Sequence, residues 1–240
     1  MLTFHQIQAS QAAAFERQLE AITRAGRTVA GDYCPAPTDT RRAIAVTFDD
    51  GLAEAFEVAL PVLKEKGIPS TWFLTTGYLG RSAGWIRDHT HASFGGRLVT
   101  LGEVKAQASP LFRVGTHTAS HARLPALGLE QVAFELRIPR RELQQALGTT
   151  ITLFAFPYGA YCEKLLSLCH DEGYRRVFAN VPVWRRASRG GFLQGRVSVE
   201  PTDWGVEFWL KLRGGYNWLA VTGFLRHHIL PRLRGCSGVH

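Results

Sequence analysis

Two pairs of side chains in this sequence are of types that bind metal ions or transfer protons. Asp49 and Asp50 are adjacent carboxylates directly after the apolar run 43–48, and His117 and His121 stand four residues apart. On a helical turn, that spacing places both imidazoles on one face, where they can share a metal ion. Each pair alone is weak evidence, because a solvated turn explains the carboxylates and core or capping roles explain the histidines.

Taken together, the two pairs fit a catalytic zinc site with a free base. Two histidines and one carboxylate are a common ligand set for catalytic zinc, with a position left open for water or substrate. The second carboxylate can then take a proton. The signatures of several other enzyme classes are missing: Thr118 stands where an H-E-x-x-H metalloprotease needs Glu, and the sequence has no P-loop, no Rossmann glycine motif and no G-x-S-x-G elbow.

Alternating patterns along the chain predict the elements that must position these groups. The helices are expected over 10–25, from about 53 to the stop at Gly67, after a capping box at Thr100 and Glu103, and over 129–147 and 161–173. The strands are expected at 43–48, 68–76, 111–117, 151–156, 174–180 and 195–199, with a long loop over 77–99. This alternation favours parallel strands joined by right-handed crossovers.

Active sites of such folds lie at the carboxyl ends of the strands. The acidic pair follows the strand over 43–48, and the histidines follow the strand over 111–117. Pro157 and Tyr158, in "FPYG", follow the strand over 151–156. We therefore expect all three places to lie on the same rim.

Composition indicates one globular α/β domain over residues 1–240. Hydrophobic residues make up 45% and charged residues 20%, without repeats or a clear linker. The sequence has no run of 18 apolar residues and starts without a basic, apolar leader, so we expect a cytoplasmic protein without a transmembrane helix. The four cysteines form no C-x-x-C pair and are expected to be reduced thiols. The net charge of +8 fits anionic partners such as glycans, phospholipid surfaces or nucleic acid, or serves solubility alone; we expect no nucleic-acid partner.

Three motifs in order, "TFDDG", "HTASH" and "FPYG", resemble the NodB-homology polysaccharide deacetylases, carbohydrate esterase family four. The resemblance covers about residues 43–180, and "STWFLTTGYLG" is similar to the segment after that family's first crossover helix. It implies a distorted (β/α) barrel of about seven parallel strands. Residues 1–42 would form an N-terminal helix and lead-in, and 204–240 an aromatic, basic C-terminal segment.

The resemblance also implies roles for individual residues. Asp49 would be the general base, and Asp50, His117 and His121 would hold a divalent metal, zinc first. The backbone N–H of Tyr158 would help to hold the oxyanion, and Pro157, Tyr158 and Trp204 would contact the substrate. The implied reaction removes acetyl groups from an N-acetylated polysaccharide or oligosaccharide; an O-acetyl esterase on the same site and a non-catalytic glycan-binding protein stay open as alternatives.

The sequence departs from the family pattern at three places. Ala155 stands where the family often has an Arg that orients the base; Arg196 is a substitute or an ordinary surface charge. "EPTDW", with Asp203, matches a fourth motif loosely, and Asp203 is otherwise a helix N-cap. The family's acid is a His, for which this sequence offers His227 in "LRH", or His89 or His91 in the long loop.

The segment 204–234 mixes aromatic and basic side chains. Trp and Phe at helical spacing are typical of packing inside a fold. A basic, aromatic helix can also lie on an anionic membrane surface. The second interpretation fits a substrate that is a lipid-linked glycan precursor at the inner face of the membrane.

Overall fold

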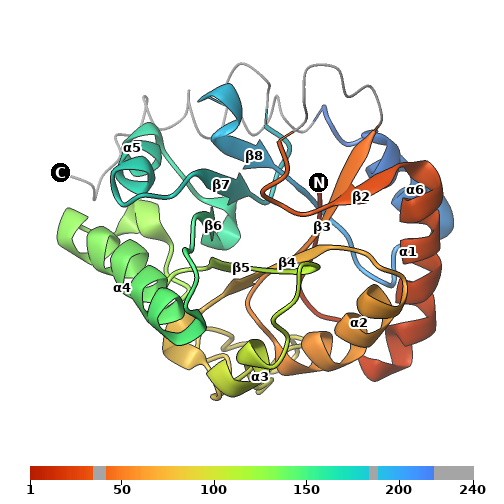
Figure 1. Ribbon diagram of the computed structural model, residues 1–240, viewed down its shortest axis with the longest axis horizontal. Coiled ribbons are helices and arrows are strands. Elements are labelled where there is room, and N and C mark those ends of the chain that lie inside the picture. The colour runs from red at the N-terminus through yellow and green to blue at the C-terminus, as the bar shows by residue number, and fades with distance from the viewer. Residues whose placement is uncertain (35–41, 184–188, 219–240) are drawn as a thin grey trace. The chain divides into compact units, whose positions relative to one another are not determined.

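The computed structural model describes residues 1–34, 42–183 and 189–218 of the chain, in which strands and helices alternate (Figure 1). The strands are β1 Leu2–Phe4, β2 Arg27–Val29, β3 Ala43–Phe48, β4 Ser70–Leu74, β5 Phe112–Thr116, β6 Leu153–Ala155, β7 Arg176–Ala179, β8 Leu193–Gly195 and β9 Val197–Ser198. The helices are α1 Ala12–Ala25, α2 Ala53–Glu65, α3 Leu101–Lys105, α4 Leu129–Leu147, α5 Glu163–Asp171 and α6 Gly205–Arg213.

The strands form one sheet in the order β8-β7-β6-β5-β4-β3-β1-β9, with β2 also paired to β3. The central strand β3 runs parallel to its neighbours, and Val46 is in register with Leu2 of β1 and with Ser70 of β4. The pairs β5–β6, β6–β7 and β7–β8 are parallel as well. Parallel pairing puts the carboxyl ends of successive strands on one side, as the alternation of elements predicts.

Contacts divide the chain into two compact units. The first comprises Met1–Trp72, Tyr78–Val114 and Ser198–Gly215. Among the described residues, the second comprises Phe73–Gly77, Gly115–Val197 and residues 216–218. The expected single domain over 1–240 stays a prediction.

Aromatic rings fill the core of the first unit. Phe48 of β3 stacks on Trp72 of β4, with ring centroids 3.9 Å apart and planes 5° from parallel, and Phe4 of β1 stacks on Phe48 at 5.5 Å. Phe15 of α1 meets Phe4 edge-on at 5.2 Å. Helix α1 lies beside α2 and α6 (Figure 1). Because Phe48 is the last residue of β3, this packing also holds the start of the turn that follows the strand.

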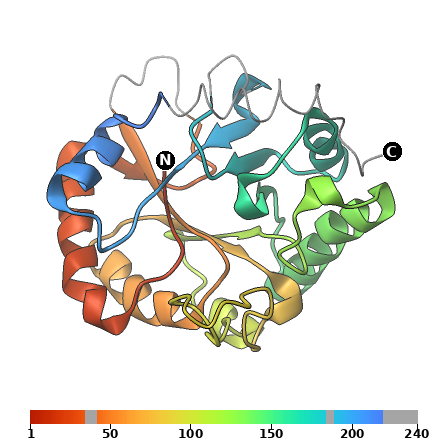
Figure 2. The ribbon, with the colours of Figure 1, turned by 180° about the vertical axis from the view of Figure 1, so that it is seen from behind.

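The second unit packs α4 and α5 against β6 and β7 (Figure 2). Its buried polar link is Tyr174, whose hydroxyl donates to Leu136 O at 2.7 Å and lies 2.8 Å from Thr116 Oγ1. Burial raises the pKa of Tyr174 well above its ordinary value, so the hydroxyl stays protonated. This link ties the end of β5, and the loop that follows it, to α4.

The predicted elements recur with small shifts at their ends. Strand β3 and helix α4 have the expected bounds, and the capping box forms: Thr100 Oγ1 accepts from Glu103 N at 3.1 Å, while Glu103 Oε2 accepts from Thr100 N at 2.6 Å. The strand expected at 195–199 is divided between β8 and β9, and β1 and β2 were not predicted. No helix of the described residues is long and apolar enough to cross a membrane.

Candidate metal centre and acid–base groups

The acidic pair ends β3 in a tight turn. Asp49 and Asp50 are buried, with 1% and 7% of their surface exposed. Asp49 N donates to Phe4 O at 3.0 Å, which continues the pairing of β3 with β1, and Gly51 N turns back to Asp49 O at 2.8 Å. Asp50 is left-handed at φ 70°, a conformation that a short polar side chain tolerates better than most. Buried carboxylates at a strand end exclude the solvated-turn interpretation.

A histidine that the sequence reading did not single out lies beside this pair. His5 follows β1, and its Nε2 is 3.8 Å from Asp49 Oδ2. The His5 side chain is about one-third exposed, whereas that of Asp49 is fully buried. The pair therefore couples a buried carboxylate to an imidazole that solvent or substrate can reach.

The two histidines follow β5, on a loop rather than on the expected helical turn. His117 N donates to Leu74 O at 2.8 Å, so the loop starts from a paired strand end. His117 Nδ1 lies 2.8 Å from Ala155 O; since a carbonyl only accepts, Nδ1 carries the proton and Nε2 offers its lone pair. The two imidazole centroids are 5.0 Å apart. Loop geometry, not helical spacing, thus brings the rings together.

Asp50, His117 and His121 form a cluster that could hold a metal ion. Each offers one ligand atom, these atoms lie within 4.8 Å of one another, and all three residues are buried. One carboxylate oxygen and two imidazole nitrogens are donors that zinc accepts. The tautomer of His117, fixed by Ala155 O, leaves the correct nitrogen for coordination. The residues present therefore fit a divalent ion.

Backbone strain concentrates in the same motifs. In the part of the chain that the structure describes, four residues other than glycine have positive φ: Asp50, Thr118, His121 and Tyr158. Such conformations cost about 1–3 kcal/mol each and persist where the surroundings enforce them, often at functional sites. Three of the four are predicted site residues, and Thr118 stands between the histidines.

The "FPYG" segment forms a single turn after β6. Pro157 is buried, whereas Tyr158 is left-handed at φ 58° and 55% exposed. The Tyr158 ring meets the His121 ring edge-on, with centroids 4.8 Å apart. The turn thus brings Tyr158 to the histidine loop, with an aromatic face open to a ligand. The assignment of its backbone N–H to an oxyanion stays a prediction.

Arg196 is buried, so its interpretation as an ordinary surface charge is wrong. None of its surface is exposed; Nε donates to Ala179 O at 3.2 Å, and Nη2 donates to Asn180 Oδ1 at 2.5 Å. The guanidinium carbon lies 5.2 Å from the ring centre of Phe73. A buried guanidinium is retained only with such partners.

The other candidate residues have varied surroundings. Asp203 is not the N-cap of α6, which is Trp204; its carboxylate accepts from Glu200 N at 3.1 Å and from Lys211 Nζ at 2.7 Å. Trp204 is 66% exposed, and its contact with substrate stays a prediction. His89 and His91 are exposed, and His227 lies outside the described residues.

A polar cavity of about 490 Å³ opens beside Asp50. Among the described residues that line it, none is Lys or Arg. Its walls come from the N-terminal stretch, the 77–99 loop and the turn after β9. They are His5, Gln6, Gln8, Gln11, Asp50, His91, Ala92, Ser93, Ser198, Glu200, Pro201 and Thr202.

Comparison with known proteins points to one family. The family model described as polysaccharide deacetylase matches residues 36–177. YxkH of Bacillus subtilis, a curated relative whose name places it in the same family, is 26% identical over 169 residues, which are 70% of this chain and 56% of YxkH. A chitin deacetylase of Pestalotiopsis is 28% identical over 57% of this chain and 41% of its own length. The chain spans about half the length of the curated relatives it matches.

Solved structures show the same fold. IcaB from Ammonifex degensii is 26% identical, with a TM-score of 0.69 over 88% of this chain and 95% of that one. The Streptococcus pyogenes deacetylase PplD, solved with acetate, is 16% identical, with a TM-score of 0.67 over the same shares. The predicted α/β fold, a distorted barrel of parallel strands, is confirmed; among the described residues the sheet runs through eight strands, with β2 paired to β3 beside them, in place of about seven.

Proposed function

Because the chain belongs to the polysaccharide deacetylase family, we propose that it is a metal-dependent hydrolase that removes acetyl groups from an N-acetylated glycan. The observation that supports this most is the cluster of Asp50, His117 and His121, whose ligand atoms lie within 4.8 Å of one another. Asp49, which directly precedes Asp50 in the sequence, is not part of this cluster, so it is a second buried carboxylate that can take part in proton transfer.

A bound divalent ion, zinc in this proposal, supplies Lewis-acid activation of the acetyl carbonyl and of water. Asp49 takes a proton from the water as its oxygen bonds to the carbonyl carbon. The N–H of Tyr158 stabilises the negative charge that develops on the carbonyl oxygen. The carbon–nitrogen bond then breaks, and the departing amine needs a proton.

His5 is our candidate for the acid that supplies this proton. It lies 3.8 Å from Asp49, and it lines the cavity beside Asp50. A partly exposed imidazole next to the base can donate a proton to the leaving amine of a substrate that is bound in the cavity. His91 lines the same cavity and is the second candidate. The buried Arg196 is the candidate for the role of the Arg that Ala155 replaces.

The cavity also bears on the substrate. Its glutamine, serine and threonine side chains suit the hydroxyl and acetamido groups of a sugar. Glu200 on its wall disfavours a carboxylate or phosphate there, whereas the charge of Asp50 would be offset by the divalent ion that it holds in this proposal. We therefore propose an uncharged glycan at this place, although the whole chain carries a net charge of +8.

Metal analysis combined with acetate release tests the proposal. The unaltered protein should bind one divalent ion and release acetate from N-acetylglucosamine oligomers. His117→Ala should lose metal and activity together, because a ligand is removed. Asp49→Ala should keep its metal but release acetate about 10²–10⁴-fold more slowly, because only the base is removed.

The same assay distinguishes the alternative activities. Parallel measurements on an O-acetylated glycan would identify an esterase if only the ester were cleaved. Glycan binding without acetate release from either substrate would identify a non-catalytic binding protein. Wild-type levels of metal in His117→Ala would contradict the assigned ligand set.

We further propose that the substrate is lipid-linked and that the protein contacts an anionic membrane surface. Val206, Trp209 and Leu210 form an exposed apolar stripe on α6, opposite the buried Phe208 and Leu212. Tryptophan side chains such as that of Trp209 favour the interface between a membrane and water. From residue 211 to 240 the sequence has no Asp or Glu and carries Arg213, Arg226, Arg232 and Arg234, besides Lys211, which is paired with Asp203 and Glu207. The expected cytoplasmic location stays a prediction.

Flotation with vesicles that contain anionic phospholipid tests the membrane contact. The protein should float with these vesicles and not with vesicles of zwitterionic lipid alone. Trp209→Ser should weaken flotation severalfold, whereas an exposed change elsewhere, Phe94→Ser, should not. Absence of flotation at low salt would exclude the contact.

A further inference from the structure

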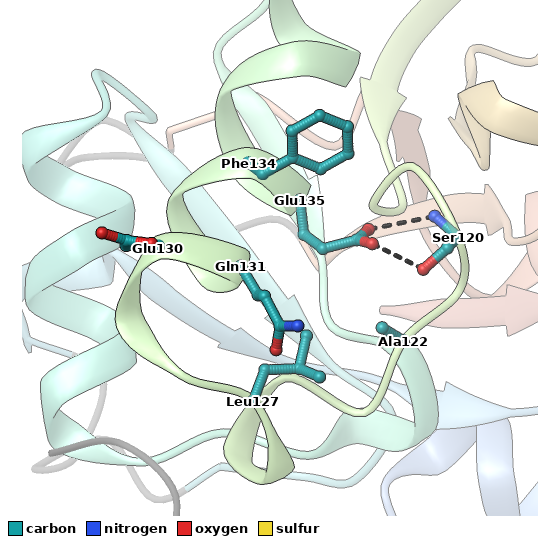
Figure 3. A pocket seen from close by; sticks show the side chains of 7 residues that line it. All are labelled: Ser120, Ala122, Leu127, Glu130, Gln131, Phe134 and Glu135. Atoms are coloured by element: carbon teal, nitrogen blue, oxygen red, sulfur yellow. Dashed lines mark hydrogen bonds between the residues drawn. The ribbon is translucent and has the colours of Figure 1, made fainter.

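A buried carboxylate on α4 faces the loop that carries the two histidines. Glu135 is only 7% exposed, although it belongs to a residue type that is seldom buried without partners. Its Oε2 accepts from Ala119 N at 2.8 Å and from Ser120 N at 3.0 Å, and its Oε1 accepts from Ser120 Oγ at 2.5 Å. Figure 3 shows the Glu135 side chain extending from α4 to Ser120.

The backbone at this loop forms a concave anion-binding arrangement. Thr118 is left-handed at φ 66°, a strained conformation for a β-branched residue, and the N–H groups of Ala119 and Ser120 follow it. Successive N–H groups next to a left-handed residue make a nest that binds negative charge. The Glu135 carboxylate occupies this nest, so one helix side chain accepts three donors from two neighbouring loop residues.

On the opposite side of the loop, backbone N–H groups after β4 bind the carbonyl groups of the loop, and Thr75 Oγ1 donates to His117 O at 3.3 Å. Thr76 N donates to Thr118 O at 3.2 Å, and Gly77 N donates to Ala119 O at 2.9 Å. These two bonds fix the carbonyl groups of the loop, whereas Glu135 fixes its N–H groups. The strained residues Thr118 and His121 thus lie on either side of a segment clamped from two directions.

We propose that Glu135 is a positioning residue for the metal centre, which holds the loop so that His117 and His121 present their nitrogens together. The inference rests on the proposed function, because it assumes that these histidines bind a divalent ion. Glu135 itself neither binds the ion nor touches the substrate. Its effect is to select the histidine arrangement before the metal arrives, so that binding does not have to order the loop.

Removal of the carboxylate leaves the loop donors without their acceptor. In Glu135→Ala all three bonds are lost, whereas an amide at this position could keep them, because its oxygen can accept from both backbone N–H groups and its NH₂ can donate to Ser120 Oγ. Glu130 offers a matched control. It lies at the start of α4 in a pocket that Glu135 and Ser120 also line, is exposed to solvent and carries the same charge (Figure 3).

The test is zinc affinity, measured on the full chain by competition with a chromophoric chelator. Glu135→Ala should raise the Kd for zinc about 10- to 100-fold, the usual cost of losing an outer partner of a metal site. Glu130→Ala should bind zinc as the unaltered protein does. At saturating zinc, kcat of Glu135→Ala should return to within about threefold of the unaltered value, because no group of the chemical step has changed.

Ser120→Ala provides a second, milder variant that removes only the hydroxyl donor. Its Kd for zinc should rise about fivefold, because two of the three bonds to Glu135 remain. If far-UV circular dichroism of the metal-free protein shows that Glu135→Ala does not fold, the test rests on Ser120→Ala. Unchanged zinc affinity in a folded Glu135→Ala, or in Ser120→Ala when the first variant does not fold, overturns the proposal.

Failure of the positioning role can be distinguished from failure of the proposed function. If the unaltered protein binds no zinc or releases no acetate, the proposed function is wrong. If it does both, and the Glu135 and Ser120 variants bind zinc equally well, only the positioning role is wrong. A lower melting temperature without a change in Kd would assign Glu135 a purely structural role and would also overturn the inference.

Discussion

At the scale of single residues, the candidate site relies on backbone groups as much as on side chains. Ala155 offers its carbonyl oxygen to His117 Nδ1, and any residue at position 155 could do the same. Ala is therefore compatible with a site in which His117 keeps its tautomer and its metal-binding nitrogen. The Arg that relatives often have at this position is not needed for that contact.

Tyr158 allows the contributions of backbone and side chain to be separated. The proposed oxyanion donor is its N–H, while its ring is 55% exposed beside His121. Tyr158→Asn keeps the N–H and tolerates the left-handed backbone. We expect KM for a glycan oligomer to rise about 3- to 10-fold from the lost aromatic face, while kcat changes less than about threefold.

Steady-state kinetics on an N-acetylglucosamine oligomer would measure both parameters for this variant. Phe94→Asn, which changes an exposed aromatic residue of the long loop, is a suitable control. A fall in kcat of more than about a hundredfold with KM unchanged would show that the Tyr158 side chain takes part in the chemical step.

The candidate site combines residues that sequence patterns single out with residues that they do not, for physical reasons. Asp49, Asp50, His117 and His121 are singled out because reactive residue types follow recognisable strands. His5 follows β1, a strand of only three residues, which is too short to show an alternating pattern. Glu135 is one of several acidic residues on α4, and only the packing of α4 against the histidine loop shows that it is buried.

At the scale of elements, long periodic segments were predictable and short ones were not. Helix α4 has the bounds that its pattern predicts, and Gly148 ends it in the left-handed conformation. The histidine loop shows the limit of pattern reading. An i, i+4 spacing suggested a helical turn, but Thr118 and His121 are left-handed, which no regular helix permits. Tertiary hydrogen bonds override the local preference there.

The capping box of α3 gives a prediction with a defined pH dependence. The side-chain hydrogen bond from Arg97, with the Thr100 N–H, lowers the pKa of Glu103 from 4.5 to about 2. The folded pKa is below the unfolded one, so this stabilisation is present above about pH 4.5 and is lost as the pH falls toward 2. Glu103→Gln should therefore destabilise the protein at about pH 7, by about 1 kcal/mol after allowance for solvent screening of a partly exposed side chain.

Urea unfolding at several pH values would measure this effect. The difference in unfolding free energy between Glu103→Gln and the unaltered protein should shrink as the pH is lowered from about 5 toward about 3. Glu142→Gln, an exposed change on α4, should show no such trend. A difference that does not depend on pH would assign the effect to something other than the charge of Glu103.

At the scale of the whole molecule, the net charge is positive, whereas the described side chains that line the cavity beside Asp50 include acidic groups but no Lys or Arg. The chain carries +8, which by itself favours anionic partners. The cavity beside Asp50 has two carboxylates and no cationic side chain of Lys or Arg among its described lining residues. Composition could not show this, because it averages over a surface whose parts differ.

The contrast predicts how the protein ranks its substrates. Acetate release from a neutral N-acetylglucosamine oligomer should exceed that from an oligomer of equal length with alternating uronic acid by about tenfold or more in kcat/KM. Glu200→Gln should narrow this difference, because it removes the carboxylate of the cavity that the proposed metal ion does not offset. Equal rates on both oligomers at low salt would contradict the proposed preference.

The four left-handed residues bear on laboratory evolution of this protein. A screen that rewards heat resistance alone would enrich Gly or Asn at positions 50, 118, 121 and 158, since these residues relieve the unfavourable torsion. Two of those positions, 50 and 121, carry proposed metal ligands, so variants selected in this way would resist heat but, on the proposed function, would lose activity. Only selection that also requires catalytic activity would retain the wild-type residues. The residues found at these four positions in a selected library would therefore show whether activity was under selection.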